Sequence, residues 1–157
     1  MMKLTVLLLL IITQTSLAQS TTPLHQLRSL YREASQHEEK CRQLSTISVP
    51  EKGSHVSAMK GYKAAATMMM AKYVFNPLSK ISYFRKGKDM LEKAILADGK
   101  NVELRFLRYT IQTNAPSFLG YNKSVSTDRQ YLLKSLPQIT DPALKNMIVS
   151  YLNTNKA

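Results

Sequence analysis

The chain has 157 residues and carries 22 Lys and Arg against 10 Asp and Glu, which gives a formal net charge of +12. This length fits one domain with one continuous core, and the single cysteine excludes an internal disulfide, so the fold is expected to rest on apolar packing. The positive charge favours acidic partners such as anionic lipid, polysaccharide, nucleic acid or an acidic protein face. The alternative is that the charge only keeps the protein soluble.

Residues 1–18 have the layout of a secretory signal peptide. Lys3 gives a basic start, an apolar run follows, and Ser16 and Ala18 are small residues two positions apart. The apolar run is far shorter than the ~20 residues that a bilayer-spanning helix needs. This pattern predicts cleavage after Ala18 and a soluble periplasmic or secreted chain, residues 19–157, whose length fits a single helical domain.

Helix starts are marked by capping side chains that directly precede a proline. The three sites are Thr22-Pro23, Asn76-Pro77 and Asp141-Pro142. The side-chain oxygen accepts hydrogen bonds from the free amides of a helix start, and proline in the first position loses no hydrogen bond there. Three such sites make helices the expected secondary structure.

Apolar residues recur at helical spacing in four segments, which predicts four helices. The first stripe comprises Leu24, Leu27, Tyr31, Ala34 and Cys41. The second comprises Met59, Tyr62, Ala66, Met69 and Tyr73. The third comprises Leu78, Ile81, Phe84, Leu91 and Ile95, and the last comprises Leu144, Ile148, Tyr151 and Leu152. The first stripe predicts one helix that carries both His25 and His37.

The connections and the remaining helices follow from composition and from exclusion. Residues 45–53, which contain Pro50, are predicted as the first linker. Residues 114–125 are predicted as a longer connection before a short helix over 127–136. Within 102–111 apolar residues alternate as in a strand, but no partner strand is available, so a well-buried helix is predicted.

The run GKDMLEKAILADGKNVELRFLR, residues 87–108, places Gly87, Leu91 and Ala94 at small, large and small positions. It resembles the second helix of a tetratricopeptide-like unit and the turn that leads to the next helix. In such a unit the small residues let two helices approach closely, and the large residue fills the gap between them. The expected fold is therefore all-α, with five or six antiparallel helices in a tetratricopeptide-like, α-solenoid-like bundle.

Four runs within residues 59–152 carry a second, separate resemblance. They are KGYKAAATMMMAKY, NPLSKISYFRKGKDMLEKAI, NVELRFLRYTIQTNAPSFLGY and LKNMIVSYL. In these runs the chain resembles a group of uncharacterised small secreted or periplasmic helical proteins of Gram-negative bacteria. The resemblance implies a helical fold and export, and it brings no established activity.

No catalytic or cofactor motif stands out. The chain lacks a serine flanked by glycines and a glycine-rich phosphate loop. His37 and Cys41 lie four residues apart beside Glu38, but they supply two good metal ligands at most, where zinc needs three or four. Met68 and its two following methionines point in three directions on a helix, so they are expected to fill the core. We therefore predict no enzyme, no cofactor and no metal site.

Cys41 leaves two alternatives open, a buried thiol that packs as a small hydrophobe and an exposed thiol that pairs between chains. It lies too far from the leader to be the lipid-bearing cysteine of a bacterial lipoprotein. The exported product is therefore expected to carry no lipid anchor.

Two features are candidates for a partner surface. Between Lys60 and Arg108 there are eleven Lys or Arg and four Asp or Glu, and Arg85, Lys86 and Lys88 lie opposite the apolar stripe of their helix. A solvated face is the simpler interpretation, and a contact surface is the alternative.

The second feature is the loop NAPSFLGY, which is unusually apolar at Phe118, Leu119 and Tyr121. These side chains either dock on the helices, which we expect, or present a patch to a partner.

The predicted function is that of a non-catalytic exported protein, an interaction or scaffold module of the cell envelope. Its expected partner is an envelope protein or an acidic surface. A cationic protein that binds polyanions, either lipid head groups or nucleic acid, is the alternative, although no specific nucleic-acid motif is present. An enzyme of unknown type is the third class.

Overall fold

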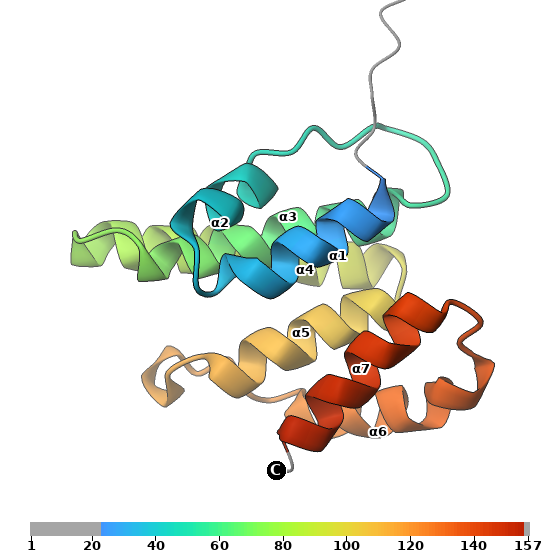
Figure 1. The fold of residues 1–157 in the computed structure, drawn as a ribbon. Helices are drawn as coiled ribbons and strands as arrows, with labels where there is room; N and C mark the ends of the chain where they lie inside the picture. Colours follow the sequence, from blue (N-terminus) through green and yellow to red (C-terminus); the bar gives the residue numbers. More distant parts are fainter. Residues whose placement is uncertain (1–22, 156–157) are drawn as a thin grey trace, which may run out of the picture.

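The computed structural model describes residues 23–155, and within them it is entirely helical. Its seven α-helices are α1 (Leu24–Ala34), α2 (Glu38–Ser45), α3 (Val56–Met69), α4 (Pro77–Ala97), α5 (Val102–Asn114), α6 (Val125–Ser135) and α7 (Pro142–Thr154) (Figure 1). Three 3-10 turns are η1 (Met70–Lys72), η2 (Ser117–Leu119) and η3 (Leu136–Gln138). The all-α class is confirmed. The predicted signal peptide, residues 1–18, lies outside the described residues.

Side-chain caps begin three of these helices. Asn76 Oδ1 accepts hydrogen bonds from the backbone N–H groups of the first turn of α4 at 2.8 and 3.2 Å, and Asp141 Oδ1 does the same for α7 at 2.9 and 3.2 Å. Both predicted cap-and-proline starts are thereby confirmed, whereas Thr22 lies outside the described residues. Asn101 caps α5 in the same way without a following proline, and the sequence analysis missed it for that reason.

The single helix predicted from Leu24 to Cys41 is wrong, because the chain breaks between Ala34 and Glu38. His37 adopts an extended conformation (φ −124°, ψ 110°) and precedes α2. The step from Ala34 to Cys41 is seven residues long, about two helical turns, and no apolar residue lies within it. The break between the two helices lets both Ala34 and Cys41 lie in the core. This break accounts for one helix beyond the expected five or six, and it separates His37 from the helix of His25.

Helix α5 is buried on two sides and joins two apolar clusters. Leu104, Leu107 and Ile111 face the larger cluster, which α1 to α4 also build. Phe106 and Tyr109 face the smaller one, with α6 and α7. The strand-like alternation in the sequence therefore consists of two interleaved helical stripes, and the helix predicted over 102–111 is confirmed. Figure 1 shows α5 between the α1–α4 layer and the α6–α7 pair.

Helices α3 and α4 pack closely at Gly87. A Cβ atom at this position would lie 2.6 Å from both Ala64 O and Met68 N, so any side chain would force the two backbones apart. Leu91, one turn further along, is fully buried. The predicted close approach through Gly87 is confirmed, and Met68 packs in the core as expected.

Within residues 23–155, no helix combines the length and the apolar character needed to cross a membrane. The expectation of one domain over residues 19–157 stays a prediction.

Candidate interaction surface

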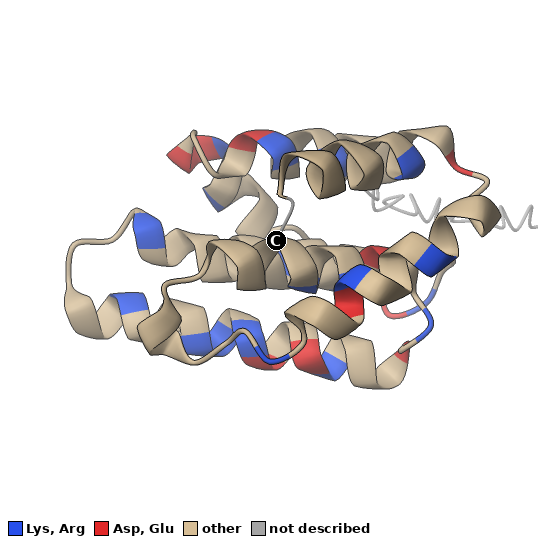
Figure 2. Cartoon of the chain, turned by 90° about the horizontal axis from the view of Figure 1, so that it is seen from below, with Lys and Arg blue, Asp and Glu red and all other residues tan. Residues whose placement is uncertain are grey.

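The predicted basic residues lie along the outer side of α4. Arg85 and Lys86 are exposed, as expected, whereas Lys88 is half-buried. Lys88 Nζ lies 5.4 Å from the centre of the Tyr121 ring, a cation–π contact. The structure thus joins one residue from each of the two predicted features, the basic cluster and the apolar loop. In Figure 2 the charged segments in the N-terminal half of α4 are blue, and the rest of that half is tan.

The apolar loop docks through Tyr121 and leaves Phe118 outside. The Tyr121 ring packs edge-to-face on Phe84 with 5.8 Å between ring centres, and Leu119 is partly buried against the core. Phe118 is 83% exposed, so the expectation that it docks is wrong. The cause is local: Phe118 is the middle residue of the single turn η2, and the left-handed Gly120 (φ +60°) redirects the chain before Tyr121.

A stronger exposed apolar feature lies at the turn between α3 and α4. Phe75 is 99% exposed, Leu78 77% and Ile81 40%. We call residues 72–81 the hairpin tip. In both Figure 1 and Figure 2 the turn between α3 and α4 reaches beyond the other helices at the left of the view.

The sequence analysis placed Leu78 and Ile81 in a core-facing stripe, and this is wrong. Helix α4 has 21 residues, whereas its antiparallel partner α3 has 14. At ~1.5 Å per residue, about two turns of α4 have no α3 residues beside them. Helical phase contributes as well: Leu78 lies on the same face of α4 as the exposed Arg85, seven residues later, and not on the face of Phe84 and Leu91.

The stretch of sequence that contains the hairpin tip is rich in positive charge. Residues 52–88 contain eight Lys and Arg and no Asp or Glu. Lys72 and Lys80 belong to the tip, and Arg85 and Lys86 follow on α4, all four being exposed. The acid-free stretch is visible in the sequence, but counting the whole segment 60–108 obscured it, because its four acids all lie after residue 88.

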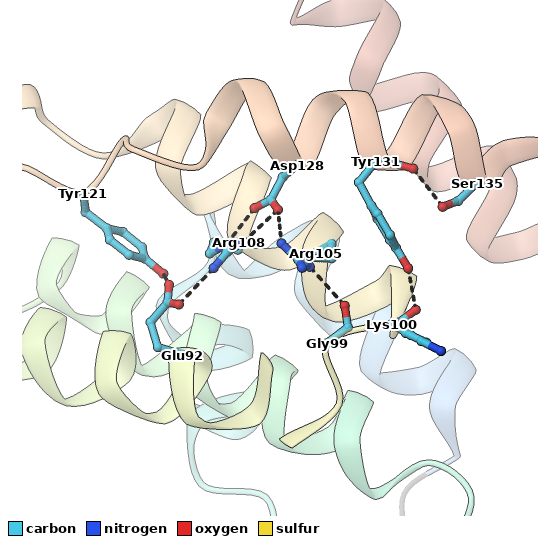
Figure 3. Close-up of polar contacts among 9 residues, drawn as sticks. All are labelled: Glu92, Gly99, Lys100, Arg105, Arg108, Tyr121, Asp128, Tyr131 and Ser135. Carbon is cyan, nitrogen blue, oxygen red and sulfur yellow. Dashed lines mark hydrogen bonds and ion pairs between the residues drawn. The ribbon is translucent and has the colours of Figure 1, made fainter. Parts of the chain in front are cut away.

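A network of charged side chains holds α4, α5 and α6 together (Figure 3). Asp128, fully buried, accepts hydrogen bonds from Arg108 Nε at 2.7 Å and Nη2 at 2.8 Å, and from Arg105 Nη1 at 3.0 Å. Arg108 Nη1 also donates to Glu92 at 2.9 Å, and Tyr121 donates to the other oxygen of Glu92 at 2.5 Å. The hydrogen bonds to Asp128 help raise the pKa of Arg108 above its ordinary value. Glu92 and Asp128 are thus both paired with arginine, which indicates that they stabilise the fold.

Arg105 also organises the edge of this network, as Figure 3 shows. Its Nε donates to Gly99 O at 3.2 Å, and its guanidinium lies 5.3 Å from the centre of the Tyr131 ring. A depression of about 540 Å³ adjoins the network, lined by Glu92, Ile95, Leu96, Gly99, Arg105 and Arg108. Its three charged residues belong to the network, so their charges are already paired.

A second network connects α1, α3, α5 and the cap of α7. Arg28 donates to both oxygens of Glu103, at 2.7 and 3.1 Å, and to Asp141 Oδ2 at 2.7 Å. Tyr62 donates to Glu103 at 2.5 Å. The hydrogen bond from Arg28 is the main cause that lowers the pKa of Asp141. These contacts fix α1, α3, α5 and the start of α7 relative to one another.

Cys41 is a buried thiol, which decides between the two alternatives left open by the sequence. Its Sγ donates a hydrogen bond to Ala66 O at 3.3 Å, and burial raises its pKa to about 11. His37, which the sequence places four residues away, is exposed. Among the described residues, no three His, Cys, Asp or Glu side chains are placed to hold a metal ion.

Comparisons of the chain with protein-family models, with curated proteins and with solved structures find no significant match. The resemblance to small secreted helical proteins of Gram-negative bacteria therefore stays a prediction. What the chain does has to be inferred from its own surface and charges.

Proposed function

We propose that the chain is a non-catalytic binding module exported to the cell envelope. Its binding surface is the hairpin tip together with Arg85 and Lys86. The observation that carries this proposal is the full exposure of Phe75 beside Leu78 at a projecting end of the molecule. Exposed apolar side chains that gather in one place mark contact sites more often than isolated ones do.

The remainder of the described structure supports this role as a rigid base. Helix α4 is held against α3 at Gly87, and against the neighbouring loop and α5 by the Glu92 contacts. The tip is therefore an extension of a firmly anchored helix. The close α3–α4 pair is also the feature that supports the proposed tetratricopeptide-like packing, an arrangement commonly used for binding.

Binding of polyanions is the second candidate, supported by the acid-free stretch over residues 52–88. The two candidates differ in salt dependence. Binding to a polyanion weakens steeply as salt rises, whereas an apolar contact does not. An enzyme has the least support, because Glu92 and Asp128 are held by arginines.

The test immobilises three proteins and compares the components that each one captures from an envelope extract at low and at high salt. They are the wild type, the double variant Phe75→Ser/Leu78→Ser, and Leu96→Ser. Leu96 is a matched control because it is 88% exposed at the other end of α4. We expect a set of components that the wild type and Leu96→Ser retain and the double variant loses. Identical captures by all three proteins would contradict the proposal.

A further inference from the structure

On the basis of the proposed function, we infer that the partner of the hairpin tip is an anionic lipid surface. Phe75 and Leu78 enter the headgroup region, and Lys80, Arg85 and Lys86 lie against the lipid phosphates. The tip docks on the membrane from one side, and none of the helices within residues 23–155 is suited to cross it.

The shape of the tip suits a soft, flat surface. Phe75 has almost its whole side chain in solvent, and Leu78 lies on the first turn of the projecting helix. The depression beside Arg105 lies elsewhere, and so does another that is lined by Tyr131 and Asp141. A projecting apolar residue needs a receptor with a pocket if the partner is a folded protein, whereas lipid yields around it.

The side-chain chemistry agrees with an interfacial position. Aromatic and aliphatic side chains gain free energy when they leave water for the acyl boundary, and basic side chains gain when they approach anionic headgroups. The tip combines both kinds within ten residues: Phe75, Leu78 and Ile81 are exposed apolar residues, and Lys72 and Lys80 are exposed bases.

The charges of the elements packed around the tip do not oppose this placement. Asp89 is the first acid after the tip and lies two turns beyond Ile81 on α4. Glu38 of α2, which lowers the positive potential near Tyr73, is paired with Arg42. Glu92 is bound by Arg108 and Tyr121. Residues 72–88 therefore carry positive charge with no acid among them, which complements an anionic surface.

The test is co-sedimentation of the exported protein with vesicles. One set contains equal parts of phosphatidylglycerol and phosphatidylcholine, and the other contains phosphatidylcholine alone. The proteins are the wild type, Phe75→Ser/Leu78→Ser, Lys80→Gln/Arg85→Gln and the control Leu96→Ser. All carry the same amino terminus, so any contribution of residues before 19 is common to them.

We expect the wild type and Leu96→Ser to bind the anionic vesicles and to bind phosphatidylcholine far less. The apolar double variant should lose about tenfold or more in partition coefficient. The basic double variant should lose about fivefold for each charge removed, and this loss should disappear at high salt. Unchanged circular dichroism is expected for all variants, because every substituted side chain is exposed.

Three results would overturn the inference. One is equal binding of the wild type and the apolar variant to anionic vesicles, which would indicate simple polyanion binding. Another is a wild-type dimer in analytical ultracentrifugation that Phe75→Ser/Leu78→Ser converts to a monomer, which would make a second copy the occupant of the tip. The third is no vesicle binding at all while the envelope capture still depends on Phe75 and Leu78. That last combination removes the lipid and leaves the proposed function intact.

Discussion

Arg108 donates two hydrogen bonds to Asp128, from Nε at 2.7 Å and from Nη2 at 2.8 Å. The two residues belong to different helices, and Asp128 is fully buried. Two parallel hydrogen bonds between a guanidinium and a carboxylate fix both distance and orientation. The ion pair thereby holds the first turn of α6 against α5, at the end of the loop that joins these helices. Tyr121, within that loop, donates a hydrogen bond to Glu92.

Asp128→Asn should destabilise the fold strongly. The substitution keeps the shape of the side chain but leaves the Arg105 and Arg108 charges without their shared partner. Loss of one partner of a buried ion pair costs about 3–5 kcal/mol. Urea titration measures the effect, with Glu38→Gln as control, since the exposed Glu38–Arg42 pair should contribute no more than about 0.5 kcal/mol. Similar losses for both variants would show that Asp128 is not buried as described.

Gly87→Ala should lower stability even though alanine favours helices. The new methyl group would lie 2.6 Å from backbone atoms of α3, which cannot move aside as a flexible side chain can. Overpacking of this kind costs about 1–3 kcal/mol. Lys86→Ala on the exposed side of the same helix should stay within about 0.5 kcal/mol. A more stable Gly87→Ala protein in urea would mean that α3 and α4 are further apart than the structure places them.

Substitution of Phe118 and of Tyr121 should affect the melting temperature differently. Phe118→Ala should leave the melting temperature nearly unchanged, because its side chain is already in solvent. Tyr121→Phe should lower it, since loss of a hydrogen bond to a charged group costs about 1.5–3 kcal/mol. Differential scanning calorimetry of both variants checks the pair. A marked loss for Phe118→Ala would restore the expectation that this side chain seals the core.

Cys41 should be unreactive in the folded protein. Its pKa is raised from 9.0 to about 11 by burial, so the reactive thiolate is scarcer at pH 8 than for a free cysteine, and the sulfur is also shielded. Ellman's reagent should therefore leave native protein unlabelled and react fully in guanidinium chloride. Ser82→Cys places a thiol on the exposed side of α4 and serves as the positive control. Equally fast reaction of native Cys41 would show that α2 opens readily.

Helices were predictable where one local signal fixed them. Asn76 and Asp141 precede prolines and cap helices, and Gly87 marks the close contact of α3 and α4. The break before α2 was also detectable in principle. It coincides with the missing apolar residue between Ala34 and Cys41, where His37 and other polar side chains are exposed instead.

The surface was predictable only in part, because exposure depends on neighbours that a periodic pattern does not contain. Arg85 and Lys86 follow from helical phase alone. Leu78 lies seven residues before Arg85, so it shares the exposed face of α4 and not the face of the core residue Phe84, and α4 also extends beyond the end of α3 at this point. The pairing of Arg108 with Asp128 is invisible for a similar reason: it depends on how the α5–α6 loop closes and not on spacing along one helix.

The most direct test of the binding surface uses the absence of tryptophan from the chain. Phe75→Trp places a single fluorophore at the hairpin tip, and Leu96→Trp places one at the other end of the same helix. On addition of phosphatidylglycerol-containing vesicles, we predict a blue shift of tryptophan emission for Phe75→Trp and none for Leu96→Trp. No shift at position 75, or the same shift at both positions, would contradict the assignment of the tip as the surface that meets anionic lipid.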